Sequence, residues 1–87
     1  MAANTNTIEQ PLTIYSTTWC GYCIRLKKQL DAAGIAYKEV DIEVNADAAE
    51  FVGRVNNGNH VVPTIEFADG RTATNPSLAQ VKQILGS

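Results

Sequence analysis

Cysteine is scarce in this 87-residue chain, which contains only Cys20 and Cys23 and a single histidine, His60. A secreted domain of this length that depends on disulfides typically carries four or more cysteines. A structural zinc site needs four nitrogen or sulfur ligands, and these three side chains are too few. Ile24 follows Cys23, where covalent haem attachment requires a histidine. We therefore interpret the two cysteines as a dithiol that opens and closes.

Excess positive charge and long apolar segments are also lacking. Seven Lys and Arg against nine Asp and Glu give a formal net charge of −2, whereas nucleic-acid-binding domains usually have a basic excess. No apolar run approaches the roughly 18 residues that cross a bilayer. Residues 1–7 have neither the basic nor the apolar region of a secretory signal. We therefore expect a cytoplasmic protein that binds neither nucleic acid nor membrane.

Hydrophobic residues make up 45% of the chain, and its length fits one core. We expect a single domain over residues 11–87, preceded by a flexible polar lead-in over residues 1–10. Hydrophobic periodicity predicts an α/β fold of order β-α-β-α-β-β-α, with a four-stranded mixed sheet and three helices. The predicted strands cover residues 12–16, 35–42, 64–67 and 71–74. Charged residues in the second of these predict an edge strand.

The ends of these elements carry recognisable signals. Gly34 is expected to stop the first helix, and Asn45 to cap the second. The dipeptide Asp69-Gly70 predicts a type I′ hairpin. Asn75 is predicted to cap the last helix, with Pro76 at its first position. The buried face of the first helix is predicted to contain Cys23, Leu26, Leu30 and Ala33.

Cys20 lies between a predicted central strand and the first turn of a helix. The first helical amides have no intrahelical partners, and the helix dipole places about half a positive charge there. A thiolate at this point accepts amide hydrogen bonds, which predicts a pKa below the usual value of about 8.5. Cys23 lies one turn further on and faces the core. We predict that Cys20 is the nucleophile and that Cys23 is the resolving thiol.

A lowered pKa of Cys20 affects its release as a leaving group more than its attack as a nucleophile. Lowering it from about 8.5 to about 6 raises the thiolate fraction at neutral pH about 30-fold, but intrinsic nucleophilicity falls about 13-fold. The net gain in attack is therefore only about twofold. The larger effect is that Cys20 becomes a good leaving group from its own mixed disulfide.

Two segments carry a resemblance to a known family. Thr18-Trp-Cys-Gly-Tyr-Cys23 after a first strand, with Val62-Pro-Thr64 before a third, resembles the glutaredoxin branch of the thioredoxin-like proteins over about residues 12–85. In that family the bond before the proline is cis, and the preceding residue offers its backbone N–H and C=O to the substrate cysteine. The resemblance implies a cis bond before Pro63 and a substrate-binding backbone at Val62, although most bonds before proline are trans.

The sequence differs at two places from that of glutaredoxins that bind glutathione. Those proteins usually carry Lys three residues before the first cysteine, where this chain has Thr17. They also have a Gly-Gly element and an acidic residue near the last helix, where this chain has Thr74-Asn-Pro-Ser77. Glutathione has two carboxylates and one amine, so the missing partners predict weaker recognition. A neutral, hydroxyl-rich thiol suits Thr17, Thr18, Asn75 and Ser77 better.

In more detail the chain is similar to the mycoredoxins, actinobacterial relatives of glutaredoxins that serve mycothiol, a thiol on a glucosamine–inositol frame. Matching segments include Trp19-Cys-Gly-Tyr-Cys23, Glu39-Val-Asp-Ile-Glu43, Val62-Pro-Thr64, Phe67-Ala-Asp-Gly70 and Thr74-Asn-Pro-Ser77. The resemblance implies a thiol–disulfide oxidoreductase that reduces mycothiol–protein mixed disulfides, with Cys20 as nucleophile and a second mycothiol or Cys23 as resolver. It implies no tightly bound cofactor, a monomer, and an indirect partnership with mycothiol disulfide reductase.

The other candidate residues surround the cysteines. Trp19 is expected to pack beside the site, and Tyr22 to line a substrate groove. Thr18, Asn75 and Ser77 are candidate substrate contacts, although such residues are more often turn and cap residues. His60, in an Asn/Gly loop, is expected to be solvated and outside the site.

Other functions stay open at this point. Within the enzymes, the alternatives are a glutathione-dependent glutaredoxin and a redoxin recharged by a flavin reductase. From another class, a dimer could carry an iron–sulfur cluster on Cys20 of two chains and two external thiols. Gly21 leaves that option open, because it stands where many active redoxins have proline.

Overall fold

The computed structural model describes residues 12–86, so the expected lead-in over residues 1–10 lies outside it. The elements follow the predicted order β-α-β-α-β-β-α and form a mixed four-stranded sheet with three helices. Their bounds are β2 (Leu12–Ser16), α1 (Gly21–Ala32), β3 (Lys38–Asp41), α2 (Ala46–Val55), β4 (Thr64–Phe67), β5 (Thr72–Thr74) and α3 (Leu78–Leu85). The predicted fold class is confirmed.

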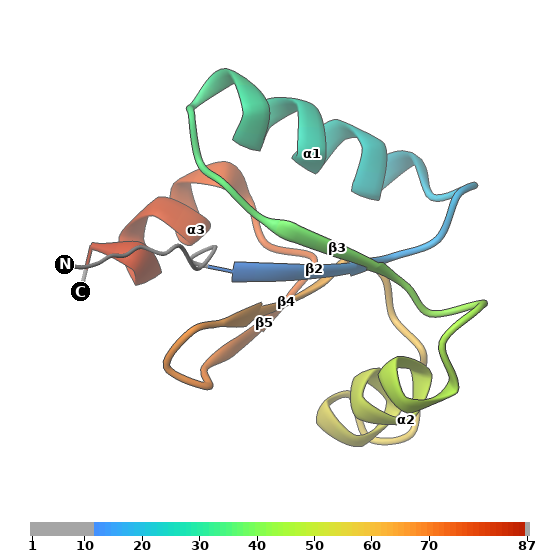
Figure 1. The fold of residues 1–87 in the computed structure, drawn as a ribbon. Coiled ribbons are helices and arrows are strands. Elements are labelled where there is room, and N and C mark those ends of the chain that lie inside the picture. Colours follow the sequence, from blue (N-terminus) through green and yellow to red (C-terminus); the bar gives the residue numbers. More distant parts are fainter. Residues whose placement is uncertain (1–11, 87) are drawn as a thin grey trace, which may run out of the picture.

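The sheet has the strand order β3-β2-β4-β5. The central strand β2 pairs in parallel with β3 and antiparallel with β4, and β4 pairs antiparallel with β5. Helices α1 and α3 cover one face of the sheet and α2 covers the other (Figure 1). Strand β3 is an edge strand, as its charged residues predicted.

The sheet separates two hydrophobic clusters. The larger one lies between the sheet and helices α1 and α3, and the smaller one lies beneath α2. Strand β2 serves both, because Ile14 is fully buried in the larger cluster while Tyr15 packs against the smaller one. This two-sided burial explains why apolar residues occur at both alternating positions of this strand. From this strand the chain reaches Cys20 through a turn at residues 17–19.

Gly34 ends α1, as predicted, whereas its neighbours Ala33 and Ile35 differ from the prediction. Gly34 has a φ of +72°, its N–H donates to the Asp31 carbonyl, and the Ile35 N–H donates to the Leu30 carbonyl. This is the Schellman arrangement, in which glycine supplies the left-handed conformation. Because Ile35 completes the helix end, β3 is shorter than the predicted strand over residues 35–42. Ala33 becomes the exposed C-cap rather than a core residue.

The β4–β5 turn is not the predicted type I′ hairpin. Only Gly70 has a positive φ in this turn, at +93°, whereas type I′ requires positive values at both central residues. The Gly70 N–H donates to the Phe67 carbonyl, and the Phe67 N–H donates to the Arg71 carbonyl. These bonds enclose a three-residue loop, Ala68 to Gly70, of the type I plus bulge kind.

Helix α3 begins two residues later than predicted. Its N-cap is Ser77, whose hydroxyl accepts from the Gln80 N–H while the Gln80 side chain accepts from the Ser77 N–H. This capping box satisfies two helix-end donors at once. Asn75 is not a cap, because it has a φ of +46° and its N–H donates to the Pro63 carbonyl at 2.8 Å. Its identity is explained by the tolerance of asparagine for the left-handed region.

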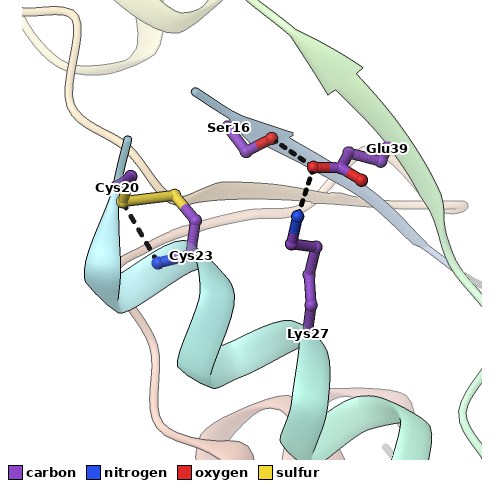
Figure 2. A network of polar contacts seen from close by, with 5 residues as sticks. All are labelled: Ser16, Cys20, Cys23, Lys27 and Glu39. Atoms are coloured by element: carbon purple, nitrogen blue, oxygen red, sulfur yellow. Dashed lines mark hydrogen bonds and ion pairs between the residues drawn. A yellow bond between two sulfur atoms is a disulfide. The ribbon is translucent and has the colours of Figure 1, made fainter. Parts of the chain in front are cut away.

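Two buried hydroxyls at the end of β2 differ in their partners. The Ser16 hydroxyl donates to Glu39 at 2.8 Å, and Lys27 of α1 donates to the same carboxylate oxygen at 2.7 Å, which ties α1 to β3 (Figure 2). Thr17 is 4% exposed, and within residues 12–86 its hydroxyl is the buried side-chain polar group without a hydrogen-bond partner. A buried hydroxyl without a partner lowers stability.

In the part of the chain that the structure describes, no helix combines the length and the apolar character that a membrane crossing requires.

Thr17→Val replaces the unpaired hydroxyl with a methyl group of similar shape. We expect the free energy of unfolding of the oxidised protein to rise by about 1 kcal/mol, measured by urea denaturation. Thr17→Ser is the matched control: it keeps the hydroxyl and removes the methyl group, so it should lower that free energy by roughly 0.8 kcal/mol. A lower stability for Thr17→Val would contradict the reading of this hydroxyl as unpaired.

Glu39→Gln removes the charge from the ion pair with Lys27 and keeps an acceptor for Ser16. Lys27 holds the pKa of Glu39 below its ordinary value, so the pair stabilises the folded state above the unfolded pKa of about 4.3 and loses this contribution as pH falls through the lower folded pKa. We expect the variant to be less stable by about 0.5 kcal/mol at pH 7, since both groups are partly exposed. The difference should vanish near pH 2.

Urea denaturation at both pH values measures this effect. Glu50→Gln, on an exposed position of α2, is the control for loss of a carboxylate in general. A Glu39→Gln deficit that is as large at pH 2 as at pH 7 would show that packing, rather than charge, is responsible.

Candidate active site

Cys20 is the N-cap of α1. Its backbone is extended, with φ −81° and ψ 110°, and its carbonyl accepts the hydrogen bond from Ile24 that opens the helix. Its Sγ accepts from the Cys23 N–H at 3.1 Å. The predicted placement at a helix start is therefore confirmed. A negative charge on this sulfur would be stabilised by that amide and by the positive end of the helix dipole.

Cys20 and Cys23 are joined in a disulfide, with their Cα atoms 5.2 Å apart (Figure 2). Cys20 keeps 4% of its surface exposed, whereas Cys23 is fully buried against the core. A reaction partner approaching from solvent therefore meets the Cys20 sulfur first. Opening and closing this bond exchanges two electrons, with the two sulfurs in unequal surroundings.

The segment before β4 lies against the reactive sulfur. The Val62–Pro63 bond is cis, as the family resemblance implied. The Val62 carbonyl oxygen lies 3.8 Å from Cys20 Sγ. Because a disulfide sulfur has no proton, this is a contact in the oxidised form, and it becomes a donor–acceptor geometry when Cys20 is a thiol. The structure thus brings together Cys20, Val62 and the buried Pro63.

A cavity of about 340 Å³ lies between α1 and the loop that leads into α3. It brings together three predicted substrate contacts, Tyr22, Asn75 and Ser77. The remaining lining residues are Arg25, Leu26, Gln29, Pro76, Leu78 and Gln80. The sequence reading missed Arg25 and Gln29 in this role, although they lie three and seven residues after Tyr22 and so share one helix face.

Thr17, Thr18 and Trp19 do not form part of this cavity lining. Thr18 is exposed in the turn before Cys20. Trp19 is 69% exposed, and its indole N–H donates to the Glu43 carboxylate at 2.8 Å. Trp19 directly precedes Cys20, but the predicted packing of its ring is not found, since most of the side chain is exposed. The expectation that Thr17 suits a ligand is also wrong, because its hydroxyl is buried.

The polar cluster of Ser16, Lys27 and Glu39 lies beside the cysteine pair, where Lys27 of α1 reaches Glu39 of β3 (Figure 2). Lys27 follows Cys23 by one helical turn, which puts both on the same face of α1. Lys27 and the Ser16 hydroxyl hold the pKa of Glu39 below its ordinary value, against a smaller effect of burial. The carboxylate is therefore ionised at neutral pH and neutralises Lys27 instead of accepting a proton.

His60 lies outside the site, as predicted. It is exposed in the loop after α2, and its ring covers Gly53, where a Cβ would approach it to 3.2 Å. Between Leu12 and Gly86 no group of three or more His, Cys, Asp or Glu side chains is arranged to hold a metal ion.

Comparisons with known proteins agree on one family. The glutaredoxin family model matches residues 12–72. A protein of Mycobacterium tuberculosis named as a glutaredoxin is 65% identical over 75 residues, which cover 86% of this chain and 89% of that protein. Mycoredoxin 1 of Corynebacterium glutamicum is 47% identical over 70 residues, covering 80% and 86% respectively.

A solved structure supports the fold independently. The glutaredoxin of Methanosarcina mazei superimposes with a TM-score of 0.73 at 21% identity, covering 87% of this chain and 78% of that one. The helix-capping cysteine, the cis-proline segment beside it and these relatives lead to one conclusion. The chain belongs to the glutaredoxin family of thiol–disulfide oxidoreductases.

Proposed function

We propose that this protein reduces mycothiol–protein mixed disulfides. The Cys20 thiolate attacks the mycothiol sulfur, and the target protein leaves as a thiolate that takes a proton from solvent. A second mycothiol thiolate then attacks the mycothiol sulfur of the adduct, forms mycothiol disulfide and releases the Cys20 thiolate. Alternatively, the Cys23 thiolate attacks Cys20, which releases mycothiol and forms the Cys20–Cys23 disulfide.

The 340 Å³ cavity carries this proposal. It lies along the helix that begins at Cys20, and its lining contains one cation, Arg25, and no carboxylate. Glutathione brings an amine and two carboxylates, so its amine would find no acidic partner in this lining. The hydroxyl of Ser77 and the side-chain amides of Asn75 and Gln29 instead suit the hydroxyl groups of a neutral sugar–polyol frame.

The relatives support the same substrate. A protein named Mycoredoxin 1 matches this chain over most of both lengths. We accordingly propose mycothiol as the co-substrate, mycothiolated proteins as the targets, and mycothiol disulfide reductase as the enzyme that regenerates mycothiol. The protein would act as a monomer in the cytoplasm, without a tightly bound cofactor.

The roles proposed for the two cysteines predict opposite effects of their removal. Cys20→Ser should lower turnover of a mycothiol mixed disulfide at least 1,000-fold, because a serine hydroxyl is not ionised at neutral pH and cannot replace the attacking thiolate. Cys23→Ser should retain at least a third of the turnover, because a second mycothiol resolves the adduct. The measurement is steady-state release of mycothiol disulfide. Turnover by Cys20→Ser, or its loss in Cys23→Ser, would contradict the mechanism.

The composition of the cavity predicts a preference between two thiols. As second substrate, mycothiol should give a rate at least tenfold higher than glutathione at equal concentration. Asn75→Asp introduces a residue that tolerates the same backbone conformation, and its carboxylate offers a partner to the glutathione amine. It should therefore lower the ratio of the mycothiol rate to the glutathione rate severalfold. Asn57→Asp, on the loop after α2, controls for charge alone. A wild-type preference for glutathione would contradict the mycothiol assignment.

A further inference from the structure

Asn56, the C-cap of α2, connects α2 with strands β4 and β5. Its side-chain Nδ2 donates to the Val52 carbonyl at 2.8 Å and to Thr64 Oγ1 at 3.1 Å. Its Oδ1 accepts from Thr74 Oγ1 at 2.6 Å. Both donor protons and the acceptor oxygen of the amide are therefore used. The three partners belong to α2, to the start of β4 and to the end of β5.

The hydrogen-bond chain continues to the segment beside the reactive sulfur. Thr64 is fully buried, and its hydroxyl accepts from Asn56 and donates to the Val61 carbonyl at 2.7 Å. The next residue, Val62, places its carbonyl oxygen 3.8 Å from Cys20 Sγ. A loss of the Asn56 donor would therefore act on the backbone one residue from this contact.

The segment is held from the other side as well. The Asn75 N–H donates to the Pro63 carbonyl at 2.8 Å, and Thr74, the residue before it, is the third partner of Asn56. One side-chain amide thus bonds to Thr64, which follows the Val62–Pro63 segment, and to Thr74, which precedes the loop that lines the cavity. A displacement of either would misplace a substrate that is held by both.

We infer that Asn56 is a positioning residue. It holds the Val62 backbone in the place where that backbone can bind a substrate disulfide whose cysteine has an amide group on each side. This rests on the proposed thiol–disulfide exchange and on the role that the resemblance to glutaredoxins implies for Val62, whose backbone would bind the substrate cysteine. Asn56 itself does not touch the sulfur. Removing its donors leaves the Cys20–Cys23 pair and the start of α1 intact, so it should slow only substrates that need the Val62 backbone.

Two probes separate these substrate types. The disulfide of N-acetylcysteine methylamide has an amide on each side of the sulfur-bearing residue, whereas bis(2-hydroxyethyl) disulfide has none. Both are tested on reduced protein with Cys23→Ser as background, so that the Cys20 adduct accumulates. In this step the Cys20 thiolate forms a bond to one sulfur of the probe, the probe S–S bond breaks, and the other half leaves as a thiolate.

Asn56→Asp is nearly isosteric and replaces both donor protons with an acceptor oxygen. We expect it to slow adduct formation with the amide-flanked probe about tenfold. The rate with bis(2-hydroxyethyl) disulfide, and the rate of Cys20 alkylation by iodoacetamide, should stay within twofold of the parent. Quenched-flow mass spectrometry of the adduct measures all three rates. Asn57→Asp, the same change on the exposed neighbouring residue, should alter none of them.

Thr64→Val tests the same chain at its second link. It removes the hydroxyl that joins Asn56 to Val61 while keeping the branched shape, and it should cause the same selective loss. Because both variants interrupt the same chain of hydrogen bonds, the double variant should react no more slowly than the slower single variant. If Asn56→Asp does not fold, Thr64→Val alone decides.

Equal slowing of both probes, or unchanged rates with both, would overturn the assignment and leave Asn56 with a structural role only. Neither probe contains mycothiol, so a failure of the mycothiol preference leaves this result unaffected.

Discussion

The hydrogen bond from the Cys23 amide to the Cys20 sulfur is the interaction on which the site depends. It exists because α1 begins immediately after Cys20, so that the Cys23 amide in the first turn of the helix points at the sulfur. The start of the helix is in turn fixed by β2, which is buried on both faces and delivers the chain to this point. The start of the helix therefore decides which sulfur receives the amide hydrogen bond.

Burial then distinguishes the surroundings of the two cysteines. Cys20 keeps a small exposed surface and Cys23 has none, because Cys23 faces the same core as Leu26 and Leu30. Solvent can therefore reach part of Cys20, whereas Cys23 is closed off behind it and bonded to it. A thiolate stabilised by helix amides gains little in attack, but it leaves easily. This asymmetry suits an exchange catalyst that must release its adduct.

Contacts between distant parts of the chain supply the rest of the site. The Val62 carbonyl, the Asn75–Ser77 loop and α1 converge because β4 pairs with β2 and with β5, and because Asn56 joins three segments through one amide. The cavity beside Tyr22 is consequently a property of the assembled fold. Its lining contains no carboxylate.

Periodicity and local signals were enough to predict the element order, the edge strand, the helix start at Cys20 and the end of α1 at Gly34. These features depend on neighbours within a few residues, where side-chain pattern and backbone preference act directly. Local signals were not enough at Asn75. Asn-Pro is a plausible helix start, yet the Asn75 N–H donates to the carbonyl of Pro63, twelve residues earlier. Trp19, held outward by Glu43, and the hydrogen-bond chain through Asn56 depend on similar long-range partners. Only packing of the sheet and helices brings such partners within hydrogen-bonding distance, so the tertiary structure alone decided them.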